Sequence, residues 1–374
     1  MSTAWLQRIG TATPRHDVHE AFAGYARTLL PSDRERQLFD RMAERSGIAH
    51  RYSVLKPGRL AAGEVDAAGF YRPGHFPGTA ARMALYKTEA LALALCAVHA
   101  LAAPDDLAAQ LARVTHLVVA SCTGFTAPGL DVHLVDALGL PTDVQRTVVG
   151  FMGCSAALPA LRVAQQAVCA NPDALVLVVN VELCSLHLQE SSNLQELLCF
   201  LLFGDGASAA LVGTAAVGAE LLNFQSRLLP ASRDLITWDI GSQGFNMHLS
   251  GLVPARIAEA LSTERDRRDG GGLLGGLLGG RLENTRAGQI PLWAVHAGGR
   301  TVLDAVQVGL TLPPSALADS RAVLAAVGNV SSTTVMFVLR RMLASARPGE
   351  RGVALAFGPG LSAEAMHFRL AGLS

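Results

Sequence analysis

The chain has 374 residues, of which 50% are hydrophobic and 17% are charged, and its 31 basic residues balance its 31 acidic ones. This length exceeds the size at which a single core stops growing, so we expect one large or two fused domains. Zero formal net charge argues against a nucleic-acid-binding protein, because phosphate contacts require an excess of basic side chains. The high apolar content also excludes a disordered chain.

The six cysteines form no C-x-x-C pair and show no spacing with histidine that is typical of a metal site. The N-terminus lacks a basic start, an apolar run and a small-residue cleavage site. No apolar run reaches the roughly 18 residues that a spanning helix needs. We therefore expect a cytoplasmic protein without a membrane span, and the apolar surface implied by the low charge fraction favours an oligomer.

In the first half, we expect a polar helical region over residues 16–53 and a buried, Ala/Leu-rich helix over 79–101. Short β-branched runs, typical of buried parallel strands, then alternate with helices. These elements are a strand over 114–120, a helix over 128–138, a strand over 145–150, a helix beginning just after Cys154 and a strand over 174–181.

A similar order recurs about 175 residues later. A strand over 292–295 leads into His296, a helix follows from Thr301, Asn329 opens another helix, and a strand covers 352–357. Cys154 follows Cys122 by 32 residues, and Asn329 follows His296 by 33. We interpret this as a duplicated α/β unit, with one half over residues 1–220 and the other over 221–374.

The stretch over 269–280 (DGGGLLGGLLGG) interrupts this pattern. Its seven glycines disfavour a helix or strand interior, so we expect a surface insertion before the His296 strand.

Cys154 is flanked by small residues and precedes a predicted helix. The positive end of a helix dipole favours a thiolate, which would make this sulfur a nucleophile. The alternative is a small buried hydrophobic residue, the more common role of a free cysteine.

His296 and Asn329 occupy matching loops of the repeat, where they are expected to face the same crevice as Cys154. Taken singly, His296 could be structural and Asn329 a helix N-cap. Together the three make chemical sense, because histidine can pair with the thiolate, and histidine and asparagine can donate hydrogen bonds to a thioester carbonyl. Such a site could stabilise the enolate left when a malonyl group loses carbon dioxide, without a metal or redox cofactor.

Seven ordered motifs make the chain similar to the type III polyketide synthases, the chalcone synthase superfamily, over nearly its full length. They are IGTATP (9–14), SCTGFTAPG (121–129), GFMGCSAA (150–157), LFGDGA (202–207), HAGG (296–299), GNVSS (328–332) and FGPGL (357–361). The resemblance implies a homodimer with a thiolase-like fold of five layers, α-β-α-β-α. It also implies that acyl-CoA and malonyl-CoA are substrates and that no cofactor is bound.

Residue by residue, the resemblance implies that Cys154 is the nucleophile and that His296 and Asn329 promote decarboxylation and condensation. Phe203 matches a gatekeeper phenylalanine, although ordinary core packing would also suit it. The other implied positions are Arg41 and Arg45 at the coenzyme A phosphates, Gly298 and Gly299 at the tunnel mouth, and Phe357, Gly358, Pro359 and Gly360 in a loop that shapes the cavity. Either arginine could instead lie on a solvated helix face.

Several positions depart from the plant members of this family. Met247 replaces a second gatekeeper phenylalanine, which predicts a more pliable entrance. Ala127 replaces a methionine that reaches across the dimer, and Ala297 replaces a proline. Positions that are small or threonine in the plant cavities are here Cys122, Cys184, His187 and Cys199.

With Cys122 in its SCTGF motif, the chain resembles bacterial members of the family that make naphthalene, alkylpyrone or alkylresorcinol products. We expect iterative condensation of malonyl-CoA onto a fatty acyl starter, giving an alkylpyrone or alkylresorcinol. A synthase that uses malonyl-CoA alone, giving a tetrahydroxynaphthalene or phloroglucinol, is the alternative. It would be favoured if Trp238, Met247 and His187 narrow the cavity. A single-round ketoacyl synthase and a non-catalytic subunit are further alternatives, and retention of all three residues disfavours the latter.

Overall fold

The computed structural model describes residues 2–266, 273–275, 290–345 and 347–372. Of the glycine-rich stretch over 269–280, only residues 273–275 are among them. Leu273 and Leu274 are buried in a hydrophobic cluster of the C-terminal half, so this short piece is packed rather than exposed.

The first half contributes five strands in the order β1-β7-β6-β4-β5. β4 pairs in parallel with both β5 and β6, whereas β7 is antiparallel to β6 and to β1. All eight residues of β6 are buried, as expected for a central strand covered on both faces. The bounds are β1 (Trp5–Ala12), β4 (His116–Ser121), β5 (Gln145–Gly150), β6 (Val176–Leu183) and β7 (Asp205–Gly213).

The second half repeats this pairing with the order β8-β13-β12-β11. β12 is parallel to β11, and β13 is antiparallel to both β12 and β8. β1 also pairs briefly with β8, which joins the halves into one nine-stranded sheet. The bounds are β8 (Ala219–Leu228), β11 (Leu292–Val295), β12 (Arg351–Gly358) and β13 (Ser362–Leu370). The repeat of strand order confirms the predicted duplication.

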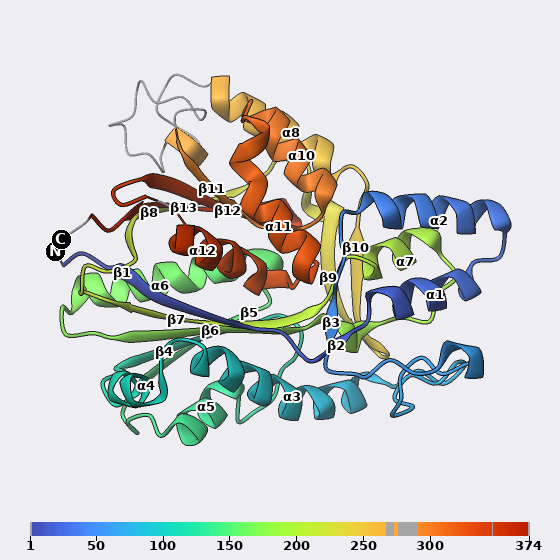
Figure 1. The fold of residues 1–374 in the computed structure, drawn as a ribbon, viewed down its shortest axis with the longest axis horizontal. Helices are drawn as coiled ribbons and strands as arrows, with labels where there is room; N and C mark the ends of the chain where they lie inside the picture. Colours follow the sequence, from blue (N-terminus) through green and yellow to red (C-terminus); the bar gives the residue numbers. More distant parts are fainter. Residues whose placement is uncertain (1, 267–272, 276–289, 346, 373–374) are drawn as a thin grey trace.

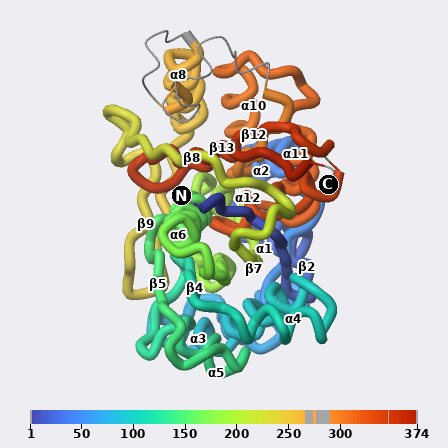
Figure 2. Tube along the Cα trace, turned by 90° about the vertical axis from the view of Figure 1, so that its left-hand side faces the viewer, coloured from blue at the N-terminus to red at the C-terminus, as the bar shows by residue number. Residues whose placement is uncertain are grey.

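The helices complete five layers (Figure 1). Helices α6 and α12 lie between the strands of the two halves, α3, α4 and α5 cover the outer face of the first half, and α8 and α10 cover that of the second. Figure 2 shows the same stacking from the side. Their bounds are α3 (Thr79–His99), α4 (Pro104–Leu111), α5 (Leu130–Leu138), α6 (Ala157–Ala170), α8 (Val253–Asp266), α10 (Arg300–Gly309), α11 (Ala318–Val327) and α12 (Thr334–Ser345).

Three hydrophobic clusters hold these layers together. The central cluster joins both halves, because it contains buried residues of α6, such as Ala160 and Ala164, and of α12, such as Met336 and Leu339. The other two clusters bury the outer faces against α3 and α5 and against α8 and α10. Because the central layer is shared, the ends of strands from both halves meet at one crevice.

Shorter elements close one end of this crevice, on the right of Figure 1. They are β2 (His16–Asp17), α1 (His19–Leu29), α2 (Asp33–Arg45), β3 (Tyr52–Ser53), α7 (Leu194–Phe200), β9 (Ile236–Gly241) and β10 (Gly244–Leu249). Short 3-10 helices occur at Leu60–Ala62, Gly153–Ser155, Cys184–His187, Arg233–Leu235, Pro314–Leu317, Ser331–Thr333 and Pro359–Leu361.

Among the described residues, no single helix is both long and apolar enough to cross a membrane. Only α3 and α4 taken together reach that length and composition, and a bend of 109° separates them.

Candidate active site

A cavity with an empty volume of about 830 Å³ lies at the crevice between the halves. Cys154 from the first half and His296 and Asn329 from the second all line it. The remaining wall is mostly apolar. Other predicted residues on its lining are Cys122, Cys184, Phe203, Met247, Gly298, Phe357, Gly358 and Pro359.

Cys154 sits in a single 3-10 turn (Gly153–Ser155) between β5 and α6. The chain turns sharply here, because both Phe151 and Gly153 have positive φ values. A Cβ on Gly153 would lie 2.4 Å from the Pro359 side chain, so only glycine fits beside the loop of the second half. This packing presents the sulfur of Cys154 to the cavity, 3.6 Å from Ser331 Oγ.

His296 follows β11 directly, and its backbone N–H donates to Leu355 O at 2.8 Å. The ring is buried, and neither ring nitrogen has a hydrogen-bond partner among the described residues. Burial lowers the pKa of His296 to about 3, so the imidazole is neutral at physiological pH. A Cβ on Gly298 would lie 3.3 Å from Nε2, and glycine therefore leaves space beside that nitrogen, which is itself buried.

Asn329 is held by hydrogen bonds that orient its amide. Oδ1 accepts from the Ser331 backbone N–H at 2.8 Å, and Nδ2 donates to Gly298 O at 3.2 Å. Because the amide has two N–H groups, one remains to donate into the cavity. The backbone of Asn329 is also fixed, because its N–H donates to Leu202 O and its carbonyl accepts from the Gly204 N–H.

The structure does not contain the Cys154–His296 hydrogen bond that the sequence predicted. Burial raises the pKa of Cys154 to about 11, and hydrogen bonds from Ser331 and Asn329 offset this only in part. Each group is driven toward its neutral form by the same loss of water. The resting site is therefore a thiol beside an imidazole, and the proton must move when substrate arrives.

Cys122 lies on the other side of Ser331, with Sγ 3.5 Å from its hydroxyl. The Glu182 carboxylate contacts this thiol, with both of its oxygens 3.4 Å from Sγ. Burial raises the pKa of Cys122 well above its ordinary value, and the Glu182 charge adds to the shift. This environment disfavours Cys122 as a nucleophile.

Glu182 was not anticipated, although an acidic residue in the apolar run of β6 was a signal for it. It is fully buried, and burial raises its pKa. It accepts hydrogen bonds from the Ser332 hydroxyl at 2.6 Å and the Thr123 hydroxyl at 2.8 Å. Ser331 is a second unanticipated residue, since it bridges the two thiols.

Phe203, Met247 and Trp238 line the cavity, and the gatekeeper role of Phe203 and Met247 stays a prediction. Met247 and Trp238 face each other across the β9–β10 hairpin, and Trp238 Nε1 donates to Cys122 O at 2.7 Å. The Phe203 backbone is anchored by Arg51, whose Nη1 donates to its carbonyl at 2.5 Å.

Four of the predicted cavity or tunnel residues do not line the cavity. His187 lies behind Trp238, with its ring stacked on Phe245 at 4.2 Å. Its direction follows from its bonds: Nδ1 accepts from the Phe245 N–H, and Nε2 pairs with Thr123 O. The other residues outside the lining are Cys199, Gly299 and Gly360.

Arg41 and Arg45 are exposed on α2. Arg300 at the start of α10 donates to the Arg45 carbonyl at 3.3 Å, so the end of α2 lies beside the loop that holds Gly298. Their role at coenzyme A phosphates stays a prediction.

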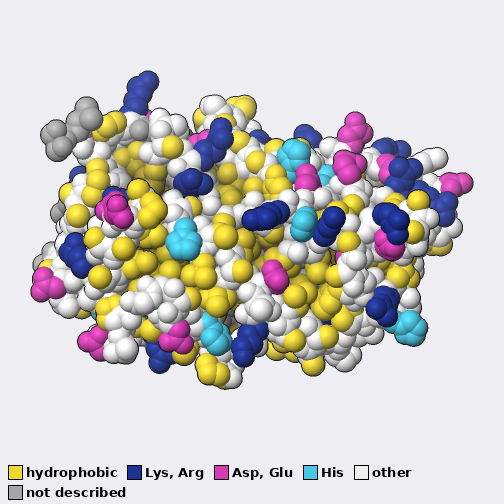
Figure 3. Space-filling view, turned by 60° about the horizontal axis from the view of Figure 1, so that its bottom comes forward, with side chains coloured by type: hydrophobic (Ala, Val, Ile, Leu, Met, Phe, Trp, Pro, Cys, Tyr) yellow, Lys and Arg dark blue, Asp and Glu magenta, His cyan; other side chains and the backbone are white. Residues whose placement is uncertain are grey.

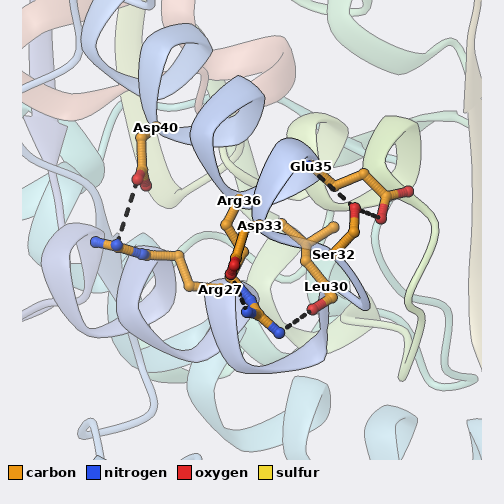
Figure 4. A network of polar contacts seen from close by, with 7 residues as sticks. All are labelled: Arg27, Leu30, Ser32, Asp33, Glu35, Arg36 and Asp40. Atoms are coloured by element: carbon orange, nitrogen blue, oxygen red, sulfur yellow. Dashed lines mark hydrogen bonds and ion pairs between the residues drawn. The ribbon is translucent and has the colours of Figure 1, made fainter.

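The start of α2 is fixed by polar contacts (Figure 4). Ser32 Oγ caps the helix by accepting from the Glu35 N–H and donating to its carboxylate. Arg27 on α1 forms an ion pair with Asp40, and Arg36 bonds both Asp33 and Leu30 O. These contacts set the direction in which α2 carries its two arginines.

Comparison with known proteins identifies relatives over almost the whole chain. Family models for the N-terminal and C-terminal domains of chalcone and stilbene synthases match residues 2–216 and 220–371. The alpha-pyrone synthesis polyketide synthase-like Pks18 of Mycobacterium tuberculosis is 33% identical, over 98% of this chain and 91% of its own length. The 1,3,6,8-tetrahydroxynaphthalene synthase of Streptomyces coelicolor is 32% identical, over 77% of this chain and 74% of its own.

Solved structures agree with these relatives. PKS-I from the brown alga Ectocarpus siliculosus superimposes with a TM-score of 0.84 at 30% identity, covering 99% of both chains. The structure of the Streptomyces coelicolor tetrahydroxynaphthalene synthase gives a TM-score of 0.83 at 28% identity and covers both chains completely.

We predict that His187 makes the fold sensitive to acid. Burial lowers its pKa to about 4, whereas an unfolded histidine titrates near 6.5, so the unfolded state binds the proton first as pH falls. The free energy of unfolding should therefore decline between about pH 6.5 and 4. A His187→Gln variant can keep both hydrogen bonds without titrating, and its decline should be shallower by up to about 1.4 kcal/mol per pH unit.

Urea unfolding at a series of pH values measures these slopes. The matched control is His248→Gln, because His248 is exposed, and its slope should equal that of the wild type. Equal slopes for the wild type and His187→Gln would contradict the prediction.

Proposed function

We propose that this chain, which belongs to the chalcone and stilbene synthase family of type III polyketide synthases, carries an acyl group on Cys154 and extends it with malonyl-CoA. The observation that carries the proposal is the convergence of Cys154, His296 and Asn329 on one mostly apolar cavity. The arrangement supplies a nucleophile, a base and an oriented amide donor, which are the groups that thioester chemistry requires.

Loading begins with proton transfer. Neutral His296 has ring nitrogens without a hydrogen-bond partner among the described residues. One of them takes the proton from the Cys154 thiol, and the sulfur attacks the carbonyl of the acyl-CoA. The Asn329 amide, which hydrogen-bonds Cys154 in the resting site, donates to the developing oxyanion. Collapse of the tetrahedral intermediate breaks the bond to coenzyme A, and the leaving thiolate recovers the proton from the imidazolium. The product is a thioester on Cys154.

Extension uses the same donors on the second substrate. The malonyl group loses carbon dioxide, and its electron pair becomes an enolate whose oxygen accepts hydrogen bonds from His296 and Asn329. Neither histidine nitrogen is bonded to protein, so the proton can reside on the one that faces this oxygen. The enolate carbon then attacks the carbonyl of the Cys154 thioester. A carbon–carbon bond forms, the bond between that carbonyl and the sulfur breaks, and Cys154 leaves as the thiolate, ready to be loaded again.

We propose a fatty acyl starter and an alkylpyrone or alkylresorcinol product. The apolar cavity wall, the pliable Met247 at the entrance and the similarity to Pks18 support this choice. The alternative is a product made from malonyl-CoA alone, which Cys122, the Trp238 side chain in the lining and the similarity to tetrahydroxynaphthalene synthase favour.

The proposed reaction balances without a metal or redox cofactor. Among the described residues, no group of three His, Cys, Asp or Glu side chains could hold a metal ion. We propose the cytoplasm as the compartment, because all six cysteines are free thiols.

The purified chain should decarboxylate malonyl-CoA and form polyketides when acyl-CoAs of graded length are supplied. His296→Ala and Asn329→Ala should lower decarboxylation by about a hundredfold or more, since each removes a donor to the enolate oxygen. Mass analysis of products and release of carbon dioxide measure these steps.

The matched control is Ser362→Ala, which lies beyond the cavity loop and should retain activity. Absence of both decarboxylation and polyketide from the wild type would overturn the proposed function.

We also propose that the chain forms a homodimer through the edge of β5. This strand pairs only with β4, and Val148 and Phe125 beside it are 56% and 42% exposed. An unpaired strand edge with apolar side chains is suited to a second copy. Figure 3 shows hydrophobic side chains spread across the middle of one face of the molecule.

Sedimentation equilibrium should give about twice the chain mass of 39.2 kDa. Val148→Lys should shift the mass toward the monomer, because a charge at the strand edge opposes pairing. Val308→Lys is the control, since Val308 is 68% exposed on α10 in the second half. A monomeric wild type would contradict the dimer.

A further inference from the structure

A second cavity of about 620 Å³ lies beside the first. It is enclosed by α1, the segment over 53–71 and the turn Cys184–His187. Both cavities are lined by Cys184, Phe200 and Phe203. The partition between them therefore consists of the side chains of these three residues.

Arg51, which lines the second cavity, holds the backbone of this partition by hydrogen bonds. Arg51 Nη1 donates to the carbonyls of Phe200 at 2.9 Å and Phe203 at 2.5 Å. Both phenylalanine side chains are only partly buried. Their rings can change rotamer while their carbonyls stay fixed, and such a change would connect the cavities.

The wall of the second cavity combines apolar side chains with polar groups that are already bonded. Asp66 accepts from the backbone N–H groups of Ala68, Phe70 and Tyr71. The hydroxyls of Ser53 and Ser185 bond each other at 2.7 Å. The Tyr71 hydroxyl donates to Ser185 O. The apolar contacts come from Val18, Ala21, Phe22, Leu55, Val65 and Leu188.

Two donors in this wall have no hydrogen-bond partner among the residues that the structure describes. Tyr25 is 6% exposed and its hydroxyl is unbonded, and Arg51 is 3% exposed with Nη2 unbonded. Arg51 uses Nε on His19, and nearby Asp205 already accepts from the Val54 N–H and from Ser185. Buried donors are costly when unpaired, so a ligand with an oxygen acceptor suits this cavity better than a plain hydrocarbon.

We propose that the second cavity binds the distal part of an acyl chain that carries an oxygen acceptor, such as a hydroxyl, keto or carboxylate group. This rests on the proposed function, because the thioester end of the same chain would lie at Cys154. The apolar wall contacts the methylenes, and Tyr25 and Arg51 donate to the oxygen. A site built around such donors discriminates against the analogue that lacks the acceptor.

Equilibrium binding tests this without turnover. In the Cys154→Ala chain, calorimetry compares decanoyl-CoA with 10-hydroxydecanoyl-CoA. The hydroxylated thioester should bind at least about fivefold more tightly, the value of one net hydrogen bond. Tyr25→Phe should reduce the difference without weakening decanoyl-CoA binding, and it should leave the fold intact because this hydroxyl bonds no other group among the described residues.

A second pair of variants tests the location. Ala21→Phe fills the cavity and should weaken both decanoyl thioesters by more than about tenfold while leaving acetyl-CoA unchanged, whereas Ala21→Ser should retain all three affinities. Equal affinities for the two decanoyl thioesters, or no effect of Ala21→Phe, would overturn the inference. If the two decanoyl thioesters differ in affinity as predicted but the wild type forms no polyketide, the proposed function alone would be overturned.

Discussion

Two backbone hydrogen bonds, between Asn329 and the segment over 202–204, join the halves of this protein at its site. The Asn329 N–H donates to Leu202 O at 2.8 Å, and its carbonyl accepts from the Gly204 N–H at 2.9 Å. This short parallel bridge couples the amide donor to Phe203, which was predicted to guard the entrance and which lines both cavities. Arg51 extends the coupling, because it holds the Phe200 and Phe203 carbonyls. The donor, the entrance and the partition to the second cavity therefore share one rigid frame.

Burial away from water determines the protonation states of the catalytic side chains. Burial raises the pKa of Cys154 and lowers that of His296, so the site rests uncharged. A neutral imidazole can accept the thiol proton during loading and donate during decarboxylation, which a permanently protonated one could not. Burial also raises the pKa of Glu182, while hydrogen bonds from four neighbours oppose that shift. Its contacts with Cys122 Sγ distinguish the environment of Cys122 from that of Cys154.

Much of the fold could be predicted because its causes are local. Runs of β-branched residues mark the buried strands, and β5 was predicted with its observed bounds. The matching positions of Cys154, His296 and Asn329 predicted that they would meet, because equivalent loops of a duplicated unit end at one crevice. The sequence also predicted the order of helices and strands in the second half. One difference is that helix α11 occupies the chain position where the first half has strand β5.

The remainder depends on packing between segments that are distant in sequence. His187 turns away from the cavity because its ring nitrogens bond Phe245 and Thr123, and no spacing in the chain reveals that direction. The second cavity is formed by side chains from four separate segments. The neutral state of Cys154 and His296 reflects burial by both halves, whereas the position of Cys154 beside a helix start alone favoured a thiolate.

The central claim is that Cys154, and not Cys122, carries the acyl group. Intact-protein mass spectrometry after brief incubation with an acyl-CoA, without malonyl-CoA, tests it most directly. The account predicts one acyl adduct on the wild type and on Cys122→Ser, and none on Cys154→Ala. An adduct that persists in Cys154→Ala and disappears in Cys122→Ser would contradict it.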